Sequence, residues 1–266
     1  MSGDFDGKIV VITGASTGLG RAIAVQVASR GAKAVVVNYA HSAAEAEETA
    51  ALVRAEGAEA VTVKADVGHD EGCKAIAAAA QPFGRIDALF NNAGITKFAP
   101  RHADLDAVTA EDFLRLYQVN VVGAFQMIRA ARPLLEACET PSAVVNTSSI
   151  AGVVGIGSSV PYAASKGALT TMTISLARAL APKIRVNAVC PGFIDTPWFG
   201  RGMDEEALER MRKNVAASTP LQVASNADDI AGATVFLASP AARHITGETL
   251  LVDAGTHLGF APLVAR

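Results

Sequence analysis

Short apolar runs rich in β-branched residues alternate with longer, alanine-rich stretches along the chain. Most of these runs are continuously apolar, which is typical of strands buried on both faces, and the stretches between them are long enough for crossover helices. The pattern predicts an α/β fold in which helices cover both faces of a doubly wound sheet of seven mostly parallel strands. The candidate strands are Lys8 to Thr13, Ala34 to Asn38, Ala60 to Lys64, Ile86 to Phe90, Ala143 to Thr147, Ile184 to Val189 and Thr249 to Val252.

Neither a linker nor a repeat divides the 266 residues, so we expect a single domain spanning residues 1–266. Two long apolar helices are expected beside the central strands, from about Ala110 to Cys138 and from Tyr162 to Leu180. The second helix carries small residues that would let another helix, of the same chain or of a second subunit, approach closely. They are Ala163, Ala164, Gly167 and Ala168.

Composition narrows the class of protein. Hydrophobic residues make up 50% of the chain and aromatic residues 5%, so the core must be aliphatic. The net charge of -3 and the absence of a basic run argue against a nucleic-acid partner. Cys73, Cys138 and Cys190 are far apart, so we expect buried free thiols rather than a disulfide framework, and we expect no metal site.

The N-terminal segment and the hydropathy pattern bear on the compartment. Met1 to Gly7 is short and acidic, unlike a signal peptide. No apolar run reaches the roughly 18 residues that a membrane span needs. We therefore expect a cytoplasmic protein without a membrane partner.

A glycine-rich turn, Thr13 to Gly20, follows the first strand and leads into a helix. Its glycines would allow a tight turn, close approach of the backbone to a pyrophosphate, and close packing of helix on strand, while the helix N-terminus offers unpaired N–H groups to the anion. The turn lacks the Gly-Lys-Ser/Thr of an ATP-type loop. It predicts a dinucleotide site with contacts from Gly14, Ser16, Thr17, Gly18 and Leu19.

The end of the second strand bears on the choice of cofactor. Asn38 stands where an acidic residue would bind the ribose diol of NAD and repel the 2′-phosphate of NADP. We therefore expect NADP(H), with NAD(H) as the alternative, and contacts from Asn38, Tyr39, His41 and Ser42. After the third strand, Asp66 and Val67 are candidates for binding adenine, although Asp66 can equally be a helix N-cap.

Tyr162 and Lys166 are four residues apart on a predicted helix and share one of its faces. A phenol normally loses its proton at about pH 10, and a neighbouring ammonium lowers that pKa towards the range useful for acid–base catalysis. An isolated pair of this kind is more often a packed tyrosine ring and a solvated lysine. The rest of the sequence has to decide between these interpretations.

The sequence resembles the short-chain dehydrogenase/reductase family over nearly its whole length. The resemblance rests on ordered motifs: the glycine-rich turn, Asn91 to Gly94, Asn120, Ser149, Tyr162, Lys166, and Pro191-Gly192. It implies a Rossmann-like fold, an NAD(P)-dependent oxidoreductase that assembles as a homotetramer, and a catalytic tetrad of Asn120, Ser149, Tyr162 and Lys166.

The resemblance also implies a role for each tetrad residue. Tyr162 would exchange a proton with the oxygen of a carbonyl or alcohol substrate, and Ser149 would hydrogen-bond and polarise that oxygen. Lys166 would bind the nicotinamide ribose and lower the tyrosine pKa. Asn120 would hold a water that relays protons. The adjacent Ser148 is expected to be a structural hydroxyl.

Further contacts follow from the same resemblance. The remaining cofactor contacts would come from Asn92, Ala93, Gly94, Pro191, Gly192, Ile194 and Thr196, and substrate contacts beside Ser149 and Tyr162 from Phe193, Trp198 and Phe199. We expect a variable substrate lid at about 193–215. Two segments that are unusual for the family, Lys97 to Asp112 and the tail 256–266, would border the active site or another subunit.

The leading expectation is an NADP(H)-dependent oxidoreductase that moves hydride between nicotinamide and a carbonyl or secondary alcohol. An NAD-dependent alcohol, sugar or steroid dehydrogenase is the alternative, and a non-catalytic cofactor-binding protein is a third. Apolar lid residues favour a neutral, fairly hydrophobic substrate. A 3-oxoacyl thioester, a quinone, a steroid and a sugar all stay open.

Overall fold

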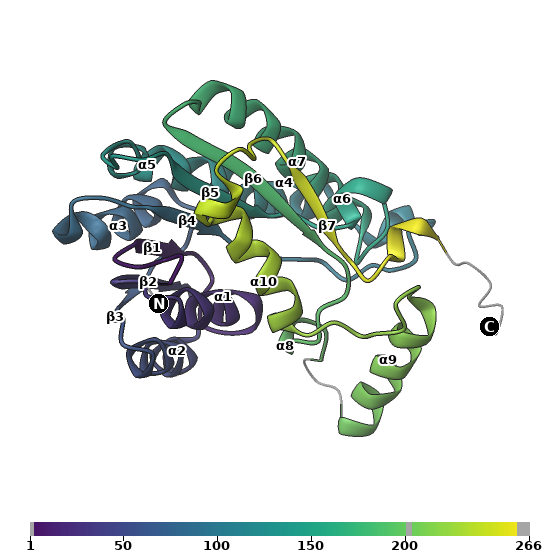
Figure 1. Cartoon of the computed structure of the whole chain (residues 1–266). Helices are drawn as coiled ribbons and strands as arrows, with labels where there is room; N and C mark the ends of the chain where they lie inside the picture. Colours follow the sequence, from purple (N-terminus) through teal and green to yellow (C-terminus); the bar gives the residue numbers. More distant parts are fainter. Residues whose placement is uncertain (1–2, 201–203, 260–266) are drawn as a thin grey trace.

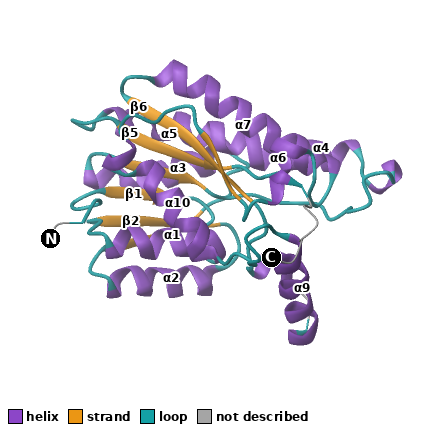
Figure 2. Cartoon of the chain, turned by 45° about the vertical axis from the view of Figure 1, so that its right-hand side comes forward, coloured by secondary structure: helices purple, strands orange, loops and turns teal. Residues whose placement is uncertain are grey.

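The computed structural model describes residues 3–200 and 204–259, and within them seven strands form one all-parallel sheet in the order β3-β2-β1-β4-β5-β6-β7 (Figures 1 and 2). Every predicted strand is present, with ends shifted by no more than two residues. The strands are β1 (Ile9–Ile12), β2 (Ala34–Tyr39), β3 (Glu59–Lys64), β4 (Ala88–Asn91), β5 (Ser142–Thr147), β6 (Ile184–Pro191) and β7 (Thr249–Val252).

Helices cover both faces of this sheet, as predicted. One face is covered by α1 (Gly18–Ser29), α2 (Ala43–Ala55) and α10 (Ala227–Ala238), and the other by α3 (Asp70–Ala80), α5 (Ala124–Glu136) and α7 (Val160–Leu180). Figure 2 shows the remaining helices towards the carboxyl ends of the strands. They are α4 (Ala110–Tyr117), α6 (Ala151–Val154), α8 (Pro197–Gly200) and α9 (Glu205–Ser218).

The continuous apolar runs in the strands follow from this double cover. Successive side chains of a strand point to opposite faces. Val10 and Ile12 of β1 therefore pack in the core beneath α1 and α10, while Val11 packs in the core beneath α3 and α5. All three side chains are fully buried, so neither face tolerates a polar residue at these positions.

The long helix expected from Ala110 to Cys138 is interrupted, which corrects the prediction. A π-helical segment, Gln118–Gly123, separates α4 from α5. Asn120 lies in this segment and is buried, with its side chain bonded to the backbone of Ile95. An irregular turn of this kind is often found at a functional site, and nothing in the apolar periodicity signals it.

The second expected helix, α7, starts two residues earlier than predicted, because the Ser159 hydroxyl caps it by accepting a hydrogen bond from the Tyr162 N–H at 3.3 Å. One of its small residues packs inside the chain. A Cβ atom added to Gly152 of α6 would lie 2.6 Å from the Gly167 nitrogen, so α6 and α7 approach closely there. Gly167 thus serves intramolecular packing.

The order of the strands creates a crevice at one edge of the sheet. The chain runs from β1 outwards through β2 to β3, then returns to β4 and continues the other way, so the loops after β1 and β4 diverge. Ligands of open α/β sheets bind at such a switch point, beyond the carboxyl ends of the strands. The motifs at Gly14, Asn92, Ser149 and Pro191 all lie at this edge.

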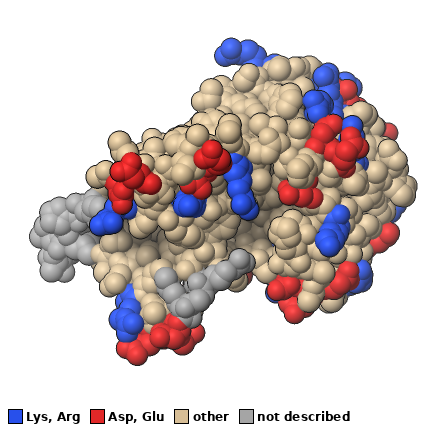
Figure 3. All heavy atoms as spheres, turned by 180° about the vertical axis from the view of Figure 1, so that it is seen from behind, with Lys and Arg blue, Asp and Glu red and all other residues tan. Residues whose placement is uncertain are grey.

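The cysteines, the hydropathy of the helices and the surface charge bear on the expectations for the whole chain. Cys73, Cys138 and Cys190 are buried free thiols, as predicted. No helix among residues 3–200 and 204–259 combines the length and the hydropathy needed to cross a bilayer. On the face seen in Figure 3, basic and acidic side chains are interspersed, in keeping with the small net charge.

Candidate active site

A cavity of about 630 Å³ opens at the carboxyl edge of the sheet, among the loops after β1, β4, β5 and β6. A second cavity of about 460 Å³ lies on the β2 and β3 side and shares Gly14, Ala93 and Gly94 with the first. Two cavities joined at the glycine-rich turn suit a ligand with two halves, such as a dinucleotide. We call them the main cavity and the side cavity.

The structure brings most of the predicted site residues to these two cavities. The main cavity is lined by Gly14, Thr17, Gly18, Leu19, Asn92, Ala93, Gly94, Ser149, Tyr162, Lys166, Pro191, Gly192, Phe193, Ile194, Thr196, Trp198 and Phe199. The side cavity adds Asn38, His41, Asp66 and Val67. Four predicted residues lie outside the linings of these two cavities: Ser16, Tyr39, Ser42 and Asn120.

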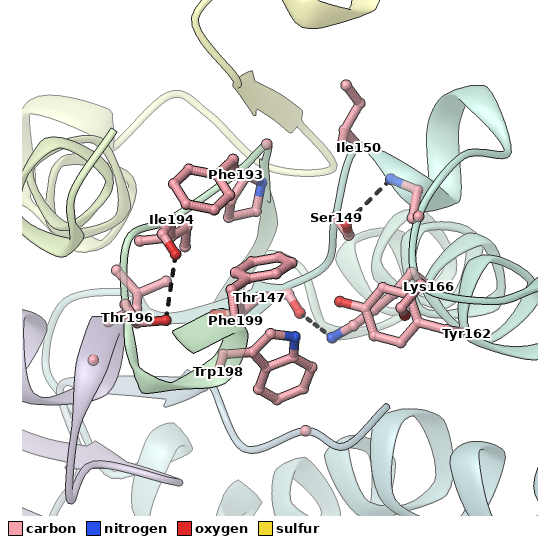
Figure 4. Close-up of a pocket in the computed structure, with 18 of the residues that line it drawn as sticks. Thr147, Ser149, Ile150, Tyr162, Lys166, Phe193, Ile194, Thr196, Trp198 and Phe199 are labelled. Atoms are coloured by element: carbon pink, nitrogen blue, oxygen red, sulfur yellow. Dashed lines mark hydrogen bonds between the residues drawn. The ribbon is translucent and has the colours of Figure 1, made fainter. Parts of the chain in front are cut away.

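Ser149 and Tyr162 converge on the main cavity from the loop after β5 and from α7 (Figure 4). The Ser149 hydroxyl oxygen accepts a hydrogen bond from the Ala151 N–H at 3.1 Å, which leaves the hydroxyl proton free to be donated. Burial raises the pKa of Tyr162 to about 12, and a hydrogen bond with Ser149 opposes that rise. The phenol therefore keeps its proton at neutral pH.

Lys166 is 4% exposed, and its ammonium group donates a hydrogen bond to the Thr147 carbonyl at 2.7 Å (Figure 4). Burial lowers the pKa of Lys166 to about 8. Since an ammonium has three N–H donors, others remain for a ligand such as a ribose diol.

The expectation that Lys166 lowers the pKa of Tyr162 is wrong for the ligand-free chain. The lysine nitrogen lies 5.7 Å from the centroid of the tyrosine ring and is held by a carbonyl instead. Removing the phenol from water disfavours its charged form, and this effect dominates. The site therefore contains a protonated tyrosine beside a lysine whose pKa is lowered by burial.

The Asn120 side chain joins the loop after β4 to α7. Its amide oxygen accepts a hydrogen bond from the Ile95 N–H at 2.9 Å, and its amide nitrogen donates to the Ile95 carbonyl at 3.0 Å and to the Ser165 hydroxyl at 3.1 Å. A Cβ atom on Gly94 would lie 3.3 Å from the Asn120 amide oxygen and 3.6 Å from the Lys166 nitrogen. Asn120 thus fixes the loop beside the lysine, and its water relay stays a prediction.

The glycine-rich turn fits a dinucleotide diphosphate. Gly14 and Gly18 have φ angles of +61° and +56°, which favour glycine. Thr17, at the N-cap of α1, makes no side-chain capping bond, and Thr17, Gly18 and Leu19 line the main cavity. The first N–H groups of α1 are therefore available to an anion, and no side chain at Gly14 or Gly18 fills the space above them.

Arg21 fixes this turn from behind, a role that the sequence pattern did not reveal. Its guanidinium donates to the Ser16 carbonyl at 2.8 Å and to the Thr49 hydroxyl at 2.9 Å. The Ser16 carbonyl accepts hydrogen bonds from Arg21 and Thr49, and the expected contact of Ser16 with the cofactor stays a prediction. An arginine that binds only backbone and helix α2 has no motif spacing by which it could have been found.

Asn38 has a structural role in the side cavity. Its amide oxygen accepts from the Gly14 N–H at 3.2 Å, and its amide nitrogen donates to the carbonyls of Val63 at 3.2 Å and Ala65 at 2.9 Å. With 1% exposure and these bonds made, its side chain joins the glycine-rich turn to β3. The expected contact of Asn38 with the cofactor stays a prediction.

The remaining wall of the side cavity includes a basic residue that the sequence pattern did not single out. Arg115 and Gln118, from α4 and the π-helical segment, line it together with His41 and Asp66. The Asp66 carboxylate accepts a hydrogen bond from the Gly68 N–H at 2.8 Å, and His69 is the N-cap of α3. The alternative in which Asp66 caps that helix is therefore wrong.

Segments far apart in the sequence build the part of the main cavity beside Trp198 and Phe199, where substrate is expected. Val215, Ser218 and Thr219 of α9 and its C-terminal end line it, so this wall reaches beyond the expected lid limit of residue 215. Phe98 and Thr256 bring the two unusual segments, 97–112 and the tail, to the same cavity. Residues 201–203 of the expected lid and 260–266 of the tail lie outside the described residues.

An ion pair joins α9 to the loop after β6. The Arg212 guanidinium donates to the Asp195 carboxylate at 2.7 Å and to Glu205 at 2.9 Å. These carboxylates raise the pKa of Arg212 above its usual range. Asp195 directly follows Ile194 of the cavity wall, so the pair joins α9 to the loop after β6.

Comparison with known proteins agrees with this geometry. A family model described as enoyl-(acyl carrier protein) reductase matches residues 14–257. L-rhamnose 1-dehydrogenase (NAD(P)(+)) of Sphingomonas sp. strain SKA58 is 38% identical over 255 residues, covering 95% of this chain and 97% of that protein. Versicolorin reductase 1 of Aspergillus parasiticus is 36% identical over 262 residues, covering 94% of this chain and 96% of that protein.

A solved structure shows the same architecture. The crystal structure of a short-chain dehydrogenase/reductase of Brucella melitensis, titled glucose/ribitol dehydrogenase, superposes with a TM-score of 0.83 at 34% identity, covering 96% of this chain and 98% of that one. The chain belongs to the short-chain dehydrogenase/reductase family of NAD(P)-dependent oxidoreductases.

Proposed function

We propose that this protein is an NADP(H)-dependent reductase of ketones in which Tyr162 is the acid. The observation that carries the proposal is the convergence of Ser149 and Tyr162 on a cavity that also contains the dinucleotide turn. When bound, the nicotinamide supplies the hydride. The chain's own residues then have to bind the carbonyl oxygen, deliver a proton to it and keep water away from the reacting carbon.

The protonation state of the site favours reduction over oxidation. With its pKa raised to about 12, Tyr162 holds at neutral pH the proton that an oxygen gaining negative charge requires. Ser149 has a hydroxyl proton free to polarise the same oxygen. Lys166, with a pKa of about 8, is largely charged at pH 7 and offers N–H donors to the ribose that positions the nicotinamide.

Charge in the side cavity supports NADP(H) over NAD(H). Asn38 is neutral, and His41 and Arg115 line the cavity, so a 2′-phosphate meets hydrogen-bond donors and a cation there. The Asp66 carboxylate works against this preference. Its oxygen already accepts a hydrogen bond from the Gly68 N–H, which reduces its repulsion of a phosphate.

Calorimetry should give a dissociation constant for NADP⁺ about tenfold below that for NAD⁺, since one charge-assisted hydrogen bond contributes about that factor. Arg115→Ala should remove most of this difference by weakening NADP⁺ binding alone. Arg178→Ala, on α7 and outside both cavity linings, is the matched control and should change neither constant. Tighter binding of NAD⁺ would instead favour an NAD-dependent alcohol, sugar or steroid dehydrogenase.

We further propose that the chain assembles as a homotetramer through helices α4, α5 and α7. Leu114 of α4, Phe125 of α5 and Ile174 of α7 are 71%, 42% and 46% exposed, which is a large exposure for apolar side chains. Exposed apolar patches of this kind are usually covered in an assembly.

Sedimentation velocity should report a tetramer for the wild-type chain, and Phe125→Glu combined with Ile174→Glu should reduce its mass to that of a dimer or monomer. Burying two carboxylates in an apolar interface is strongly unfavourable. Leu52→Glu on α2, where the wild-type side chain is 45% exposed, is the control and should leave the tetramer intact. A wild-type monomer would contradict this proposal.

A further inference from the structure

Aromatic side chains are concentrated in the main cavity. They make up 5% of the chain, yet five of them are among the described residues that line it: Phe98, Tyr162, Phe193, Trp198 and Phe199. They come from the loop after β4, from α7, from the loop after β6 and from α8. Segments so far apart in the sequence share one aromatic wall, which points to a common ligand.

The rings contact one another and leave faces open to the cavity. The centroids of Phe193 and Phe199 are 5.0 Å apart, those of Phe98 and Phe199 are 6.5 Å apart in an edge-to-face arrangement, and those of Tyr162 and Trp198 are 6.3 Å apart. Figure 4 shows Phe199 and Trp198 facing the side of the cavity where Tyr162 lies. The wall therefore begins next to the group that would protonate the substrate.

Two of these rings stay partly exposed in the isolated chain, although each packs near another ring. Phe98 is 56% exposed and Trp198 is 37% exposed. Leaving large apolar surface in water is unfavourable, and an exposed apolar patch that lines a pocket commonly marks a ligand-binding surface. A ligand with flat apolar faces would remove this surface from water.

Three hydroxyl groups that line the main cavity near α9 and the tail already donate hydrogen bonds within the protein. The hydroxyl of Ser218 donates to the Val215 carbonyl at 2.8 Å, that of Thr219 to the Val223 carbonyl at 3.0 Å, and that of Thr256 to the Asp253 carbonyl at 2.6 Å. A sugar needs several free donors and acceptors, because each unmatched hydroxyl that it buries is unfavourable. This wall offers few of them.

Apart from Lys166, the described residues that line the main cavity carry no charged side chain. Among the described residues that line it, Lys166 is the one with a charged side chain at pH 7, and it is 4% exposed and bonded to the Thr147 carbonyl. A substrate with a carboxylate or phosphate beside its carbonyl would lose water there without gaining a partner. The lining thus selects a neutral molecule.

We propose that the substrate is a neutral, flat aromatic ketone, whose carbonyl is carried on, or fused to, an aromatic ring system. This inference rests on the proposed function and specifies its substrate class. The carbonyl oxygen lies between Ser149 and Tyr162, and the ring system packs against Trp198 and Phe199. The ketone carbon would gain a hydride from NADPH and the oxygen the Tyr162 proton, which gives the secondary alcohol and NADP⁺ and leaves a Tyr162 phenolate that regains its proton from water.

The test compares two ketones of one skeleton: 2-tetralone, which has an aromatic ring, and 2-decalone, its saturated counterpart. We expect kcat/KM with NADPH to be at least about tenfold higher for 2-tetralone, since each aromatic contact contributes roughly a two- to tenfold factor beyond buried area. Trp198→Leu and Phe199→Leu should each lower this ratio by about threefold or more. Phe236→Leu, on α10 and outside the cavity, is the control and should preserve it.

Binding separates this inference from the proposed function. Calorimetry on the Tyr162→Phe protein loaded with NADPH gives dissociation constants for both ketones without turnover. A clearly lower constant for 2-tetralone supports the aromatic wall, and equal constants overturn it, whether or not the wild-type protein reduces either ketone. Faster oxidation of L-rhamnose than reduction of 2-tetralone would also overturn it. Absence of any turnover, with 2-tetralone still bound preferentially, would overturn the reductase proposal alone.

Discussion

Tyr162→Phe should lower kcat/KM for NADPH-dependent ketone reduction by about 10²- to 10⁴-fold, the usual contribution of a positioned general acid. The substitution removes the phenolic proton donor and keeps the ring that packs near Trp198 at 6.3 Å. The dissociation constant of NADPH should stay within about twofold of the wild-type value, because the lost hydroxyl contacts the reacting oxygen rather than the diphosphate turn. Steady-state kinetics and calorimetry measure the two quantities.

The pH profile gives this prediction a second measurement. Since burial raises the pKa of Tyr162 to about 12, the acid keeps its proton throughout the neutral range. Lys166 has a pKa lowered to about 8, so its charge is present below that pH and is lost above it. Reduction by the wild-type enzyme should therefore be steady up to about pH 8 and decline above it. Retention of full activity by Tyr162→Phe at pH 7 would rule out the assigned acid.

Ser149→Ala should lower kcat for ketone reduction by about 10²- to 10³-fold, as the loss of one donor to a developing oxyanion does in other enzymes. The Ser149 hydroxyl has its proton available because its oxygen accepts the Ala151 N–H at 3.1 Å. KM for the ketone should change little by comparison, because the bond strengthens chiefly in the transition state. Initial rates at saturating NADPH measure both constants.

The adjacent serine provides the matched control. The Ser148 hydroxyl donates to the Lys166 carbonyl at 2.9 Å and lies 2.8 Å from the Thr170 hydroxyl, so its bonds are to α7. Ser148→Ala should lower Tm, since it removes a buried hydrogen bond between the loop after β5 and α7, while reducing kcat far less than Ser149→Ala. If the two variants lost the same activity, the assignment of Ser149 to the substrate oxygen would be incorrect.

The sheet and the sites on it could be predicted because both depend on local sequence. A strand buried on both faces must be apolar throughout, as in Val10 to Ile12, and parallel strands bring their carboxyl ends to one edge. The glycine-rich turn and Ser149 follow such strands directly. The strand pattern therefore predicts that the glycine-rich turn and Ser149 lie at the same edge of the sheet.

The features that the sequence did not predict arise from contacts between residues far apart in the chain. Asn120, in the π-helical segment, is bonded to Ile95, and the structural role of Asn38 depends on the carbonyls of Val63 and Ala65. Phe98 lies in a segment without a motif, and only the fold brings it to Phe199. The raised pKa of Tyr162 depends on burial, which spacing along a helix does not report.

The most direct test of the central claim follows the hydride itself. The wild-type enzyme is incubated with 2-tetralone and NADPH carrying deuterium at one face of nicotinamide C4, and the alcohol is analysed by mass spectrometry. The proposed function predicts that one of the two C4-labelled forms transfers its deuterium to the carbinol carbon and the other does not, with Tyr162→Phe giving little product. Alcohol formed without deuterium from either form would contradict hydride transfer at this site.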